Sequence, residues 1–203
     1  MAERQSTLRA RQRAETQRVI QAHAVRLFTE RGYDATTVNE VAEAAGVSAM
    51  TVYRHFPTKE DLVLADQHGG LVAERLAATS PAQPLVRRIG RALVDATATL
   101  TEGDPATRRH LLARLRLMIS APALRARHLD NHYALQEAIV DALGVTDPEG
   151  TFQARAAAGA CLAAMHTALV RWAEEDGKTS LPALIAQAQA AAFGDNPAED
   201  GAT

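Results

Sequence analysis

The segment spanning residues 32–59 restricts the fold of this 203-residue chain more than any other part of it. Thr37 is followed three residues later by Glu40, a capping-box pattern that marks the start of a helix. Apolar residues then recur at helical spacing, and Gly46 suits the left-handed conformation that ends a helix. The pattern predicts a short helix over residues 38–45, followed by a tight turn.

A second short helix is predicted directly after this turn. Ser48 can cap a helix over residues 49–55, and Pro57 ends it because proline disfavours helical geometry at the preceding residue. Two helices joined by a glycine turn form a helix-turn-helix unit, whose second helix enters the major groove of DNA.

The side chains of the second helix suit this role. Ala49, Met50 and the methyl group of Thr51 can contact thymine methyl groups, and the Thr51 hydroxyl can reach an acceptor or a phosphate. Donors suited to phosphate oxygens follow at Tyr53, Arg54, His55 and Lys59. The alternative is an ordinary helical hairpin with a solvated polar face.

The segment contains a glycine and an aromatic residue, two threonines, a helix, Gly-Val-Ser, a Thr-apolar-Tyr-x-His-Phe run and a Lys-Glu-x-Leu start to the next helix. The residues of this run are Gly32, Tyr33, Thr36, Thr37, Gly46, Val47, Ser48, Thr51, Val52, Tyr53, His55, Phe56, Lys59, Glu60 and Leu62. In all of these positions the segment resembles the DNA-binding domain of the tetracycline-repressor (TetR) family of bacterial regulators.

The resemblance implies roles for individual positions. The family's usual phosphate contacts match Thr37, Tyr53, His55 and Lys59, and its base-facing positions match Asn39, Ala49, Met50 and Thr51. Ser48 and Arg54 complete the predicted DNA-binding set. Because alanine and methionine offer little hydrogen-bond readout, we expect DNA shape to share in sequence recognition.

Composition and charge fit a helical DNA-binding protein. Apolar residues make up 47% of the chain and aromatic residues only 4%, with abundant alanine, which predicts an all-α fold. The net charge is −2, but residues 1–60 hold nine Lys and Arg against seven Asp and Glu. The basic excess therefore lies in the half that carries the helix-turn-helix.

The domain boundaries follow from turn residues and charge. We predict a flexible basic arm over residues 1–10, a three-helix DNA-binding domain over 11–57, a ligand-binding and dimerisation domain over 58–193, and a disordered tail over 194–203. The arm could be a solvated tail or could touch phosphate or the minor groove. Further helices are predicted over 11–31, 58–78, 84–101, 105–119, 122–143, 148–176 and 181–193.

The second domain is predicted to form a homodimer through its last two helices. The region from Arg114 to Trp172 is similar to a C-terminal domain of actinobacterial TetR-family members, and in the family this domain dimerises and binds a small molecule. Residues 154–164 are rich in alanine, as is the helix after Leu181, so helices from two chains could approach closely in a four-helix bundle. The alternative is that the alanine-rich helix lies in the core of one chain.

Large or polar-tipped residues on otherwise aliphatic helices are the predicted ligand-binding residues, and the effector is expected to be largely apolar. They are Leu115, Met118, His132, Tyr133, Met165, His166 and Trp172. Any of the large apolar members could equally fill the core.

No metal site and no cofactor are predicted. His128 and His132 lie four residues apart and could face one ion, but no acidic or cysteine partner forms a recognisable motif with them. The single cysteine, Cys161, is expected to be an inert core residue. The chain also lacks recognisable catalytic arrangements, so we do not expect an enzyme.

The sequence therefore predicts a cytoplasmic regulator that binds a palindromic operator in double-stranded DNA as a homodimer. No signal peptide or membrane-spanning segment is recognisable. The leading hypothesis is a repressor released by a small-molecule effector. The alternatives are an activator, a regulator without a ligand, and a metal-binding helical protein.

Overall fold

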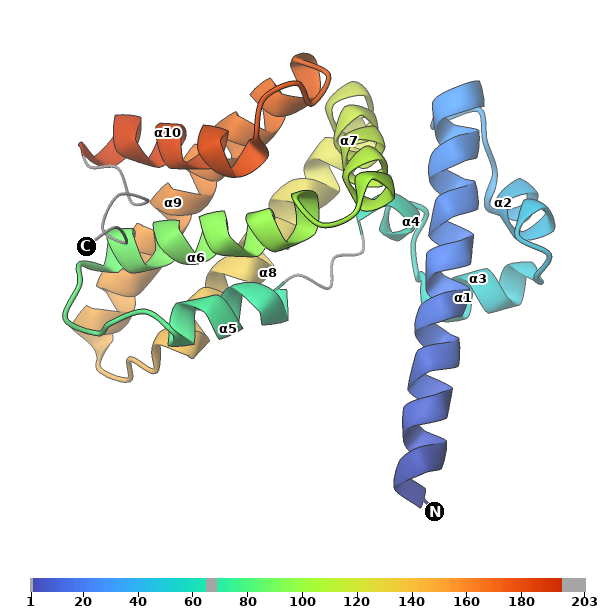
Figure 1. Ribbon diagram of the computed structural model, residues 1–203. Helices are drawn as coiled ribbons and strands as arrows, with labels where there is room; N and C mark the ends of the chain where they lie inside the picture. Colours follow the sequence, from blue (N-terminus) through green and yellow to red (C-terminus); the bar gives the residue numbers. More distant parts are fainter. Residues whose placement is uncertain (1, 65–68, 195–203) are drawn as a thin grey trace. The chain divides into compact units, whose positions relative to one another are not determined.

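The computed structural model describes residues 2–64 and 69–194, and the regular elements within these ranges are all α-helices. The helices are α1 (Ala2–Arg31), α2 (Val38–Ala44), α3 (Ala49–His55), α4 (Asp61–Leu64), α5 (Gly69–Ala77), α6 (Leu85–Thr101), α7 (Pro105–Ser120), α8 (Pro122–Leu143), α9 (Pro148–Glu174) and α10 (Leu181–Phe193) (Figure 1). The predicted all-α fold is confirmed, with an N-terminal helix-turn-helix and a helical C-terminal region.

The chain divides into two compact units. The first, which we call the N-terminal unit, contains residues 1–65 together with 117–125, the segment around the junction of α7 and α8. The second, the C-terminal unit, contains residues 66–116 and 126–203. The sequence prediction placed the boundary near residue 57 and did not assign the 117–125 segment to the first unit.

Helix α1 begins earlier than predicted. It is helical from Ala2, so the predicted start of this helix at residue 11 was wrong. The physical reason lies in the sequence, because residues 2–10 contain no glycine or proline and several strong helix formers. At its other end α1 stops at Gly32, whose φ is +91° and whose N–H donates to the Phe28 carbonyl at 3.0 Å.

The N-terminal unit is held together by the apolar face of α1. Ile20, Ala24 and Phe28 on this helix are at most 1% exposed. The Tyr33 ring meets the Phe28 ring edge-on, with 5.1 Å between the ring centroids. Helices α2 and α4 both pack against α1, and α3 packs against α2.

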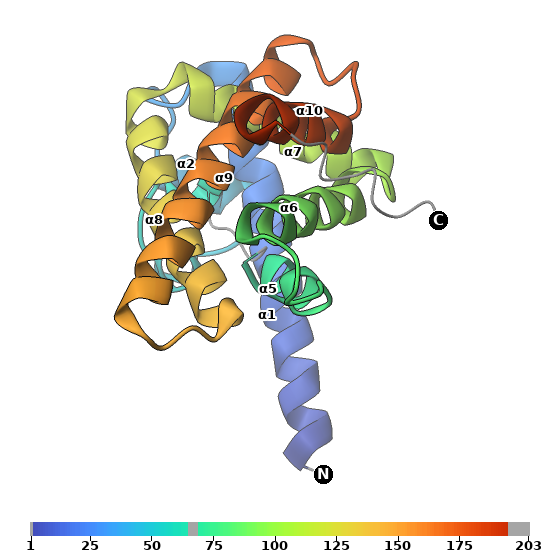
Figure 2. The same cartoon turned by 90° about the vertical axis from the view of Figure 1, so that its left-hand side faces the viewer.

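The C-terminal unit is built around α6, α9 and α10. These three helices contact one another, and α5 packs against α6 (Figures 1 and 2). Polar side chains also support the packing. Gln189 of α10 donates to the Cys161 carbonyl of α9 at 2.9 Å, and the Trp172 indole N–H donates to the Thr179 carbonyl at 2.9 Å.

Helices α8 and α9 run antiparallel in the C-terminal unit. Arg155 of α9 forms an ion pair with Glu137 of α8 at 2.9 Å, and its carbonyl accepts from Gln136 at 3.1 Å. Further along α9, His166 meets His128, which lies earlier in α8. Residues later in α9 therefore contact residues earlier in α8, which shows that the two helices run antiparallel.

Some predicted segments involve residues outside the described ranges. The helix predicted over 58–78 corresponds to α4 and α5, and residues 65–68 between them are not described. The tail predicted from residue 194 likewise lies outside the described residues, except for Gly194, the left-handed C-cap of α10. Among the described helices, none is long and apolar enough to cross a membrane.

Candidate nucleic-acid interface

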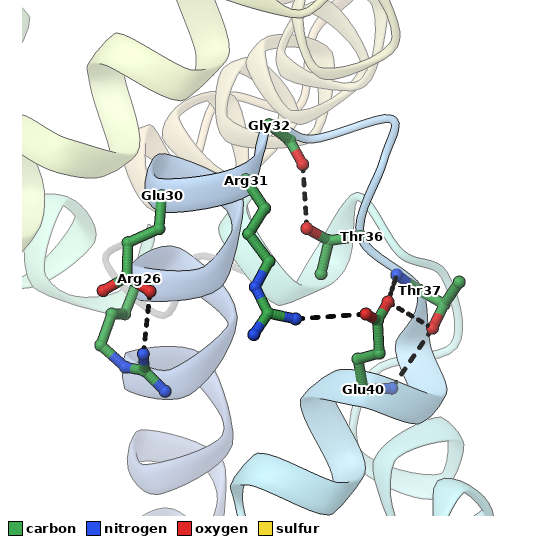
Figure 3. A network of polar contacts seen from close by, with 7 residues as sticks. All are labelled: Arg26, Glu30, Arg31, Gly32, Thr36, Thr37 and Glu40. Atoms are coloured by element: carbon green, nitrogen blue, oxygen red, sulfur yellow. Dashed lines mark hydrogen bonds and ion pairs between the residues drawn. The ribbon is translucent and has the colours of Figure 1, made fainter.

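The start of α2 is fixed by the predicted capping box. The Thr37 hydroxyl accepts the Glu40 N–H at 3.3 Å, and the Glu40 carboxylate accepts the Thr37 N–H at 2.8 Å (Figure 3). Arg31, the last residue of α1, reaches the same carboxylate at 3.2 Å. The hydrogen bonds from Thr37, helped by the charge of Arg31, lower the pKa of the Glu40 carboxyl group.

The turn between α2 and α3 satisfies the last carbonyls of α2. Gly46 has φ +67°, its N–H donates to the Glu43 carbonyl at 3.1 Å, and the Val47 N–H donates to the Ala42 carbonyl at 3.0 Å. This pair of bonds defines a Schellman motif, which requires a left-handed residue where Gly46 stands. The glycine turn that the sequence predicts therefore sets the direction in which the chain enters α3.

A hydroxyl cap at the start of α3 and two buried side chains hold the helix in place. The Ser48 hydroxyl accepts the Thr51 N–H at 3.1 Å and lies 3.0 Å from the Thr51 hydroxyl. Val52, which is 0% exposed, and Phe56, which is 2% exposed, fasten the helix to the unit. The predicted bounds of α3 coincide with the observed ones, Ala49–His55.

The face of α3 opposite Val52 lies open to solvent. Met50 is 74% exposed and Tyr53 is 48% exposed, and Arg54 is also exposed. Of the other residues in the predicted DNA-binding set, Thr37, Asn39 and Ser48 are exposed, and Ala49, Thr51, His55 and Lys59 are half-buried. No acidic residue occurs in the sequence between Glu43 and Glu60, so this segment carries no charge of its own that would repel phosphate.

Lys59 makes contacts that the sequence did not reveal. Its ammonium group donates to the Tyr33 carbonyl at 2.6 Å and lies 4.3 Å from the centroid of the Tyr33 ring. The Tyr33 hydroxyl in turn donates to Glu60 at 2.8 Å. Lys59 therefore ties the start of the α4 region to the loop after α1, and an ammonium group has further donors for a phosphate.

The imidazole of His55 favours its neutral form. Burial lowers the pKa of this group, and the positive charges of Arg13 and Arg54 lower it further. Its Nδ1 atom is buried with no hydrogen-bond partner. A neutral imidazole can still donate one hydrogen bond from its other nitrogen, which is what a phosphate contact would need.

The predicted ligand-binding residues differ in their burial and in the unit to which they belong. Leu115 is buried in the C-terminal unit, whereas Met118 is buried in the N-terminal unit. Trp172 is 0% exposed with its N–H already bonded, so it fills the core. Tyr133 is 69% exposed and does not line an enclosed site within one chain, while Met165 is half-buried.

The two remaining predicted residues do meet. His132 and His166 lie together with His128, and one ring nitrogen from each of the three is within 4.8 Å of the others. The spacing of His128 and His132 was visible in the sequence. His166 lies on a different helix, so only the antiparallel packing of α8 and α9 could reveal it as the third member.

Two family models match the chain and together cover most of both units. Residues 20–65 match the model described as bacterial regulatory proteins, tetR family. Residues 83–192, more than half of the chain, match the model described as the MftR C-terminal domain.

Curated relatives match mainly around the helix-turn-helix. The chain is 50% identical over 40 residues to the HTH-type transcriptional repressor KstR2 of Rhodococcus jostii, covering 20% of each chain. It is 34% identical over 92 residues to the HTH-type transcriptional regulator AcrR of Shigella flexneri, covering 42% of this chain and 43% of AcrR. The chain thus spans less than half the length of these relatives.

Solved structures match over nearly the whole chain. The fatty acid degradation regulator FadR from Bacillus halodurans superposes with a TM-score of 0.59 at 21% identity, covering 88% of this chain and 95% of FadR. FadR from Bacillus subtilis, solved in complex with stearoyl-CoA, gives a TM-score of 0.54 at 20% identity, covering 86% and 96%. Likeness at this level of identity establishes the fold. The two family models show that the chain belongs to the TetR family of bacterial transcriptional regulators, which bind DNA through a helix-turn-helix and are not enzymes.

Proposed function

We propose that this protein is a ligand-responsive repressor that binds a palindromic operator as a homodimer and inserts α3 into the major groove. The observation that carries this proposal is the division of α3 into two faces. Val52 is fully buried, whereas Met50, Tyr53 and Arg54 lie exposed on a capped helix whose segment holds no acidic residue. A helix anchored on one side and open on the other can enter a groove without rearrangement.

Within this proposal, base and phosphate contacts come from different parts of the N-terminal unit. Ala49, Met50 and Thr51 in the first turn of α3, with Asn39 of α2, face the base edges. Phosphate contacts come from the exposed or half-buried donors Thr37, Ser48, Tyr53, Arg54, His55 and Lys59. Lys59 keeps its bond to the Tyr33 carbonyl while another of its donors reaches the DNA.

Homodimerisation is proposed through α9 and α10. On α9, Ala156, Ala160, Ala163 and Thr167 are all exposed, and their spacing places them along one face of the helix. Ala183 and Ala191 are exposed on α10. Small side chains allow close helix approach, so these faces suit an apolar four-helix bundle about a twofold axis.

Twofold symmetry of the protein predicts twofold symmetry of its DNA site. Half-sites should lie about one helical turn, ~34–36 Å, apart or a multiple of that distance, so that both copies of α3 reach the same side of the duplex.

The effector is proposed to be a largely apolar small molecule bound in the C-terminal unit. The Bacillus subtilis FadR, which shares this fold, was solved in complex with stearoyl-CoA, and this makes acyl-CoAs the first compounds to test. The effector must bind the DNA-incompetent state of the dimer more tightly, because only a difference in affinity can drive release. An activator, or a regulator without a ligand, would share the DNA-binding geometry.

The DNA-binding part of the proposal is tested with duplexes selected from a random library by the purified chain. We expect an inverted repeat to be enriched. Arg54→Ala should weaken binding to every duplex and reduce the salt slope of the dimer by about two units, because each of its two copies loses one phosphate contact. Arg109→Ala, which removes an exposed arginine of α7 in the C-terminal unit, is the matched control and should leave both the affinity and the salt slope unchanged. Wild-type DNA affinity in Arg54→Ala, or an equal loss in both variants, would contradict the proposed interface.

A further inference from the structure

Three histidines from two helices converge inside the C-terminal unit. His128 and His132 lie one turn apart on α8, and their ring centroids are 4.4 Å apart. His166 of α9 lies opposite them, with its ring centroid 5.1 Å from that of His128 and 5.6 Å from that of His132. Among the described residues, they form a group whose nitrogens could reach one ion.

The hydrogen bonding of this group is incomplete. His128 Nε2 lies 3.1 Å from His166 Nδ1, so these two nitrogens can share one proton. His132 Nε2, however, is buried with no hydrogen-bond partner. A buried polar atom without a partner carries a free-energy cost unless something supplies one.

Two of the three imidazoles, those of His132 and His166, favour the neutral form that ligates metals. Burial lowers the pKa of His132, with a further contribution from His166, and burial lowers the pKa of His166. Neutral imidazole offers a lone pair, whereas a protonated imidazole offers none.

We propose that His128, His132 and His166 bind one divalent transition-metal ion of the zinc class. Ring nitrogens around tetrahedral zinc lie about 3.4 Å apart, given Zn–N distances of roughly 2.0–2.1 Å. The three nitrogens here already lie within 4.8 Å of one another, so small side-chain rotations complete the site. A metal ion would accept the lone pair of the unpartnered His132 Nε2 and replace the shared proton between His128 and His166.

The ligand set defines the class of ion. Three imidazoles without a carboxylate favour zinc, nickel, cobalt or copper over magnesium and calcium, which prefer oxygen ligands. Three protein ligands also leave a fourth coordination position for water or a donor atom of a small molecule. The sequence alone predicted no metal site, and the revision follows from His166, which the packing of α8 against α9 places beside the other two.

Metal binding would join α8 to α9 at this point. Since the ligands come from two helices, an ion that binds only the folded state stabilises their packing, and the gain rises with the ion concentration relative to its dissociation constant. The ion pair between Arg155 and Glu137, which also links these helices, lies on the surface, where such pairs contribute little.

The test uses the full chain without an affinity tag, stripped of metal by a chelator and dialysed. Titration with ZnCl2, followed by calorimetry, should show one equivalent bound per chain and a rise in Tm. CoCl2 should give the intense visible absorption of a tetrahedral cobalt site. His132→Gln and His166→Gln should each weaken zinc binding by at least about tenfold, because even the partners of metal ligands change affinity by ~10–100-fold.

His110→Gln is the matched control. His110 is also half-buried in the C-terminal unit and burial also lowers its pKa, but it lies outside the cluster. The control should bind zinc like the wild type.

The proposal is overturned if the wild type takes up no zinc, if its cobalt complex is octahedral, or if zinc affinity persists in both cluster variants. The cobalt spectrum of the wild type decides the matter even if a variant does not fold. DNA binding is measured on separate samples, so failure of this proposal leaves the proposed DNA-binding function untouched.

Discussion

The helix-turn-helix and the core of the C-terminal unit are specified by the chain in different ways. Between Thr37 and Thr51 every cap and turn is made by residues three to five positions apart. The helices of the C-terminal unit also have local caps, but the polar contacts that join one helix to another link distant residues, as Gln189 does with Cys161 and His128 does with His166. The helix-turn-helix presents Met50, Tyr53 and Arg54 on its surface, whereas the three histidines of the C-terminal unit are half-buried. A surface suited to DNA can thus be encoded locally, whereas a pocket or metal site depends on the packing of the whole unit.

Substitution of Trp172 should have the largest effect on stability. Trp172→Ala leaves a cavity at a fully buried position and removes the bond to the Thr179 carbonyl, so we expect a loss of about 3–5 kcal/mol. Urea unfolding followed by circular dichroism measures it. Trp172→Phe, which keeps much of the volume, is the control and should cost less. A loss below about 1 kcal/mol for Trp172→Ala would contradict the core role assigned to this residue.

Substitution of the turn glycine, Gly46, should have the second-largest effect on stability. Gly46→Ala places a side chain at φ +67°, and no atom lies within 4 Å of the added carbon, so the cost is backbone strain alone, about 1–2 kcal/mol. Gly46→Asn should cost less because asparagine tolerates this conformation. Equal destabilisation by alanine and asparagine, measured by the same unfolding assay, would show that the turn is not governed by local backbone preference.

The α2 cap should have a smaller effect. Thr37→Ala removes the oxygen that accepts the Glu40 N–H and should cost about 1 kcal/mol of unfolding free energy in the same assay. Thr37→Ser retains this oxygen and should restore most of the stability. If serine were as destabilising as alanine, the methyl group rather than the cap would be responsible.

The thiol in the C-terminal core should show almost no reaction. Burial raises the pKa of Cys161 to about 12, and the side chain is 0% exposed. At pH 8 the thiolate fraction would be only about one in ten thousand, so a disulfide reagent should modify the native chain only as fast as the core opens. Rapid modification of native protein that matches the rate in urea would show that this core is open.

The local character of the first region explains why its elements could be predicted in detail. The bounds of α3 follow from Ser48 and Pro57 alone, and the capping box fixes the start of α2. The sequence did not predict the extension of α1 to Ala2, because the arginine-rich residues before residue 11 suggested a flexible basic arm despite their helix propensity. The inward turn of Lys59 toward the Tyr33 carbonyl was also missed, since it depends on a contact between loops.

The surroundings of the candidate residues in the C-terminal unit could not be predicted from the sequence, because they depend on how distant helices pack. Trp172 and Tyr133 have side chains suited to a ligand pocket, but one is buried with its N–H bonded and the other is exposed. Neither fact follows from residue type or helical periodicity. Two members of the histidine cluster, His128 and His132, could be paired from their i, i+4 spacing in the sequence. The third, His166, could be added only by knowing which helices pack together.

Site-specific photo-crosslinking tests most directly whether α3 enters the DNA groove. Met50 is 74% exposed and Tyr133 is 69% exposed, so a benzophenone amino acid at either position is similarly accessible and should disturb folding little. With the selected operator duplex, position 50 should crosslink to bases within each half-site and position 133 should not crosslink. Absence of crosslinks from position 50 on a duplex that the variant still binds would contradict the placement of α3 in the major groove.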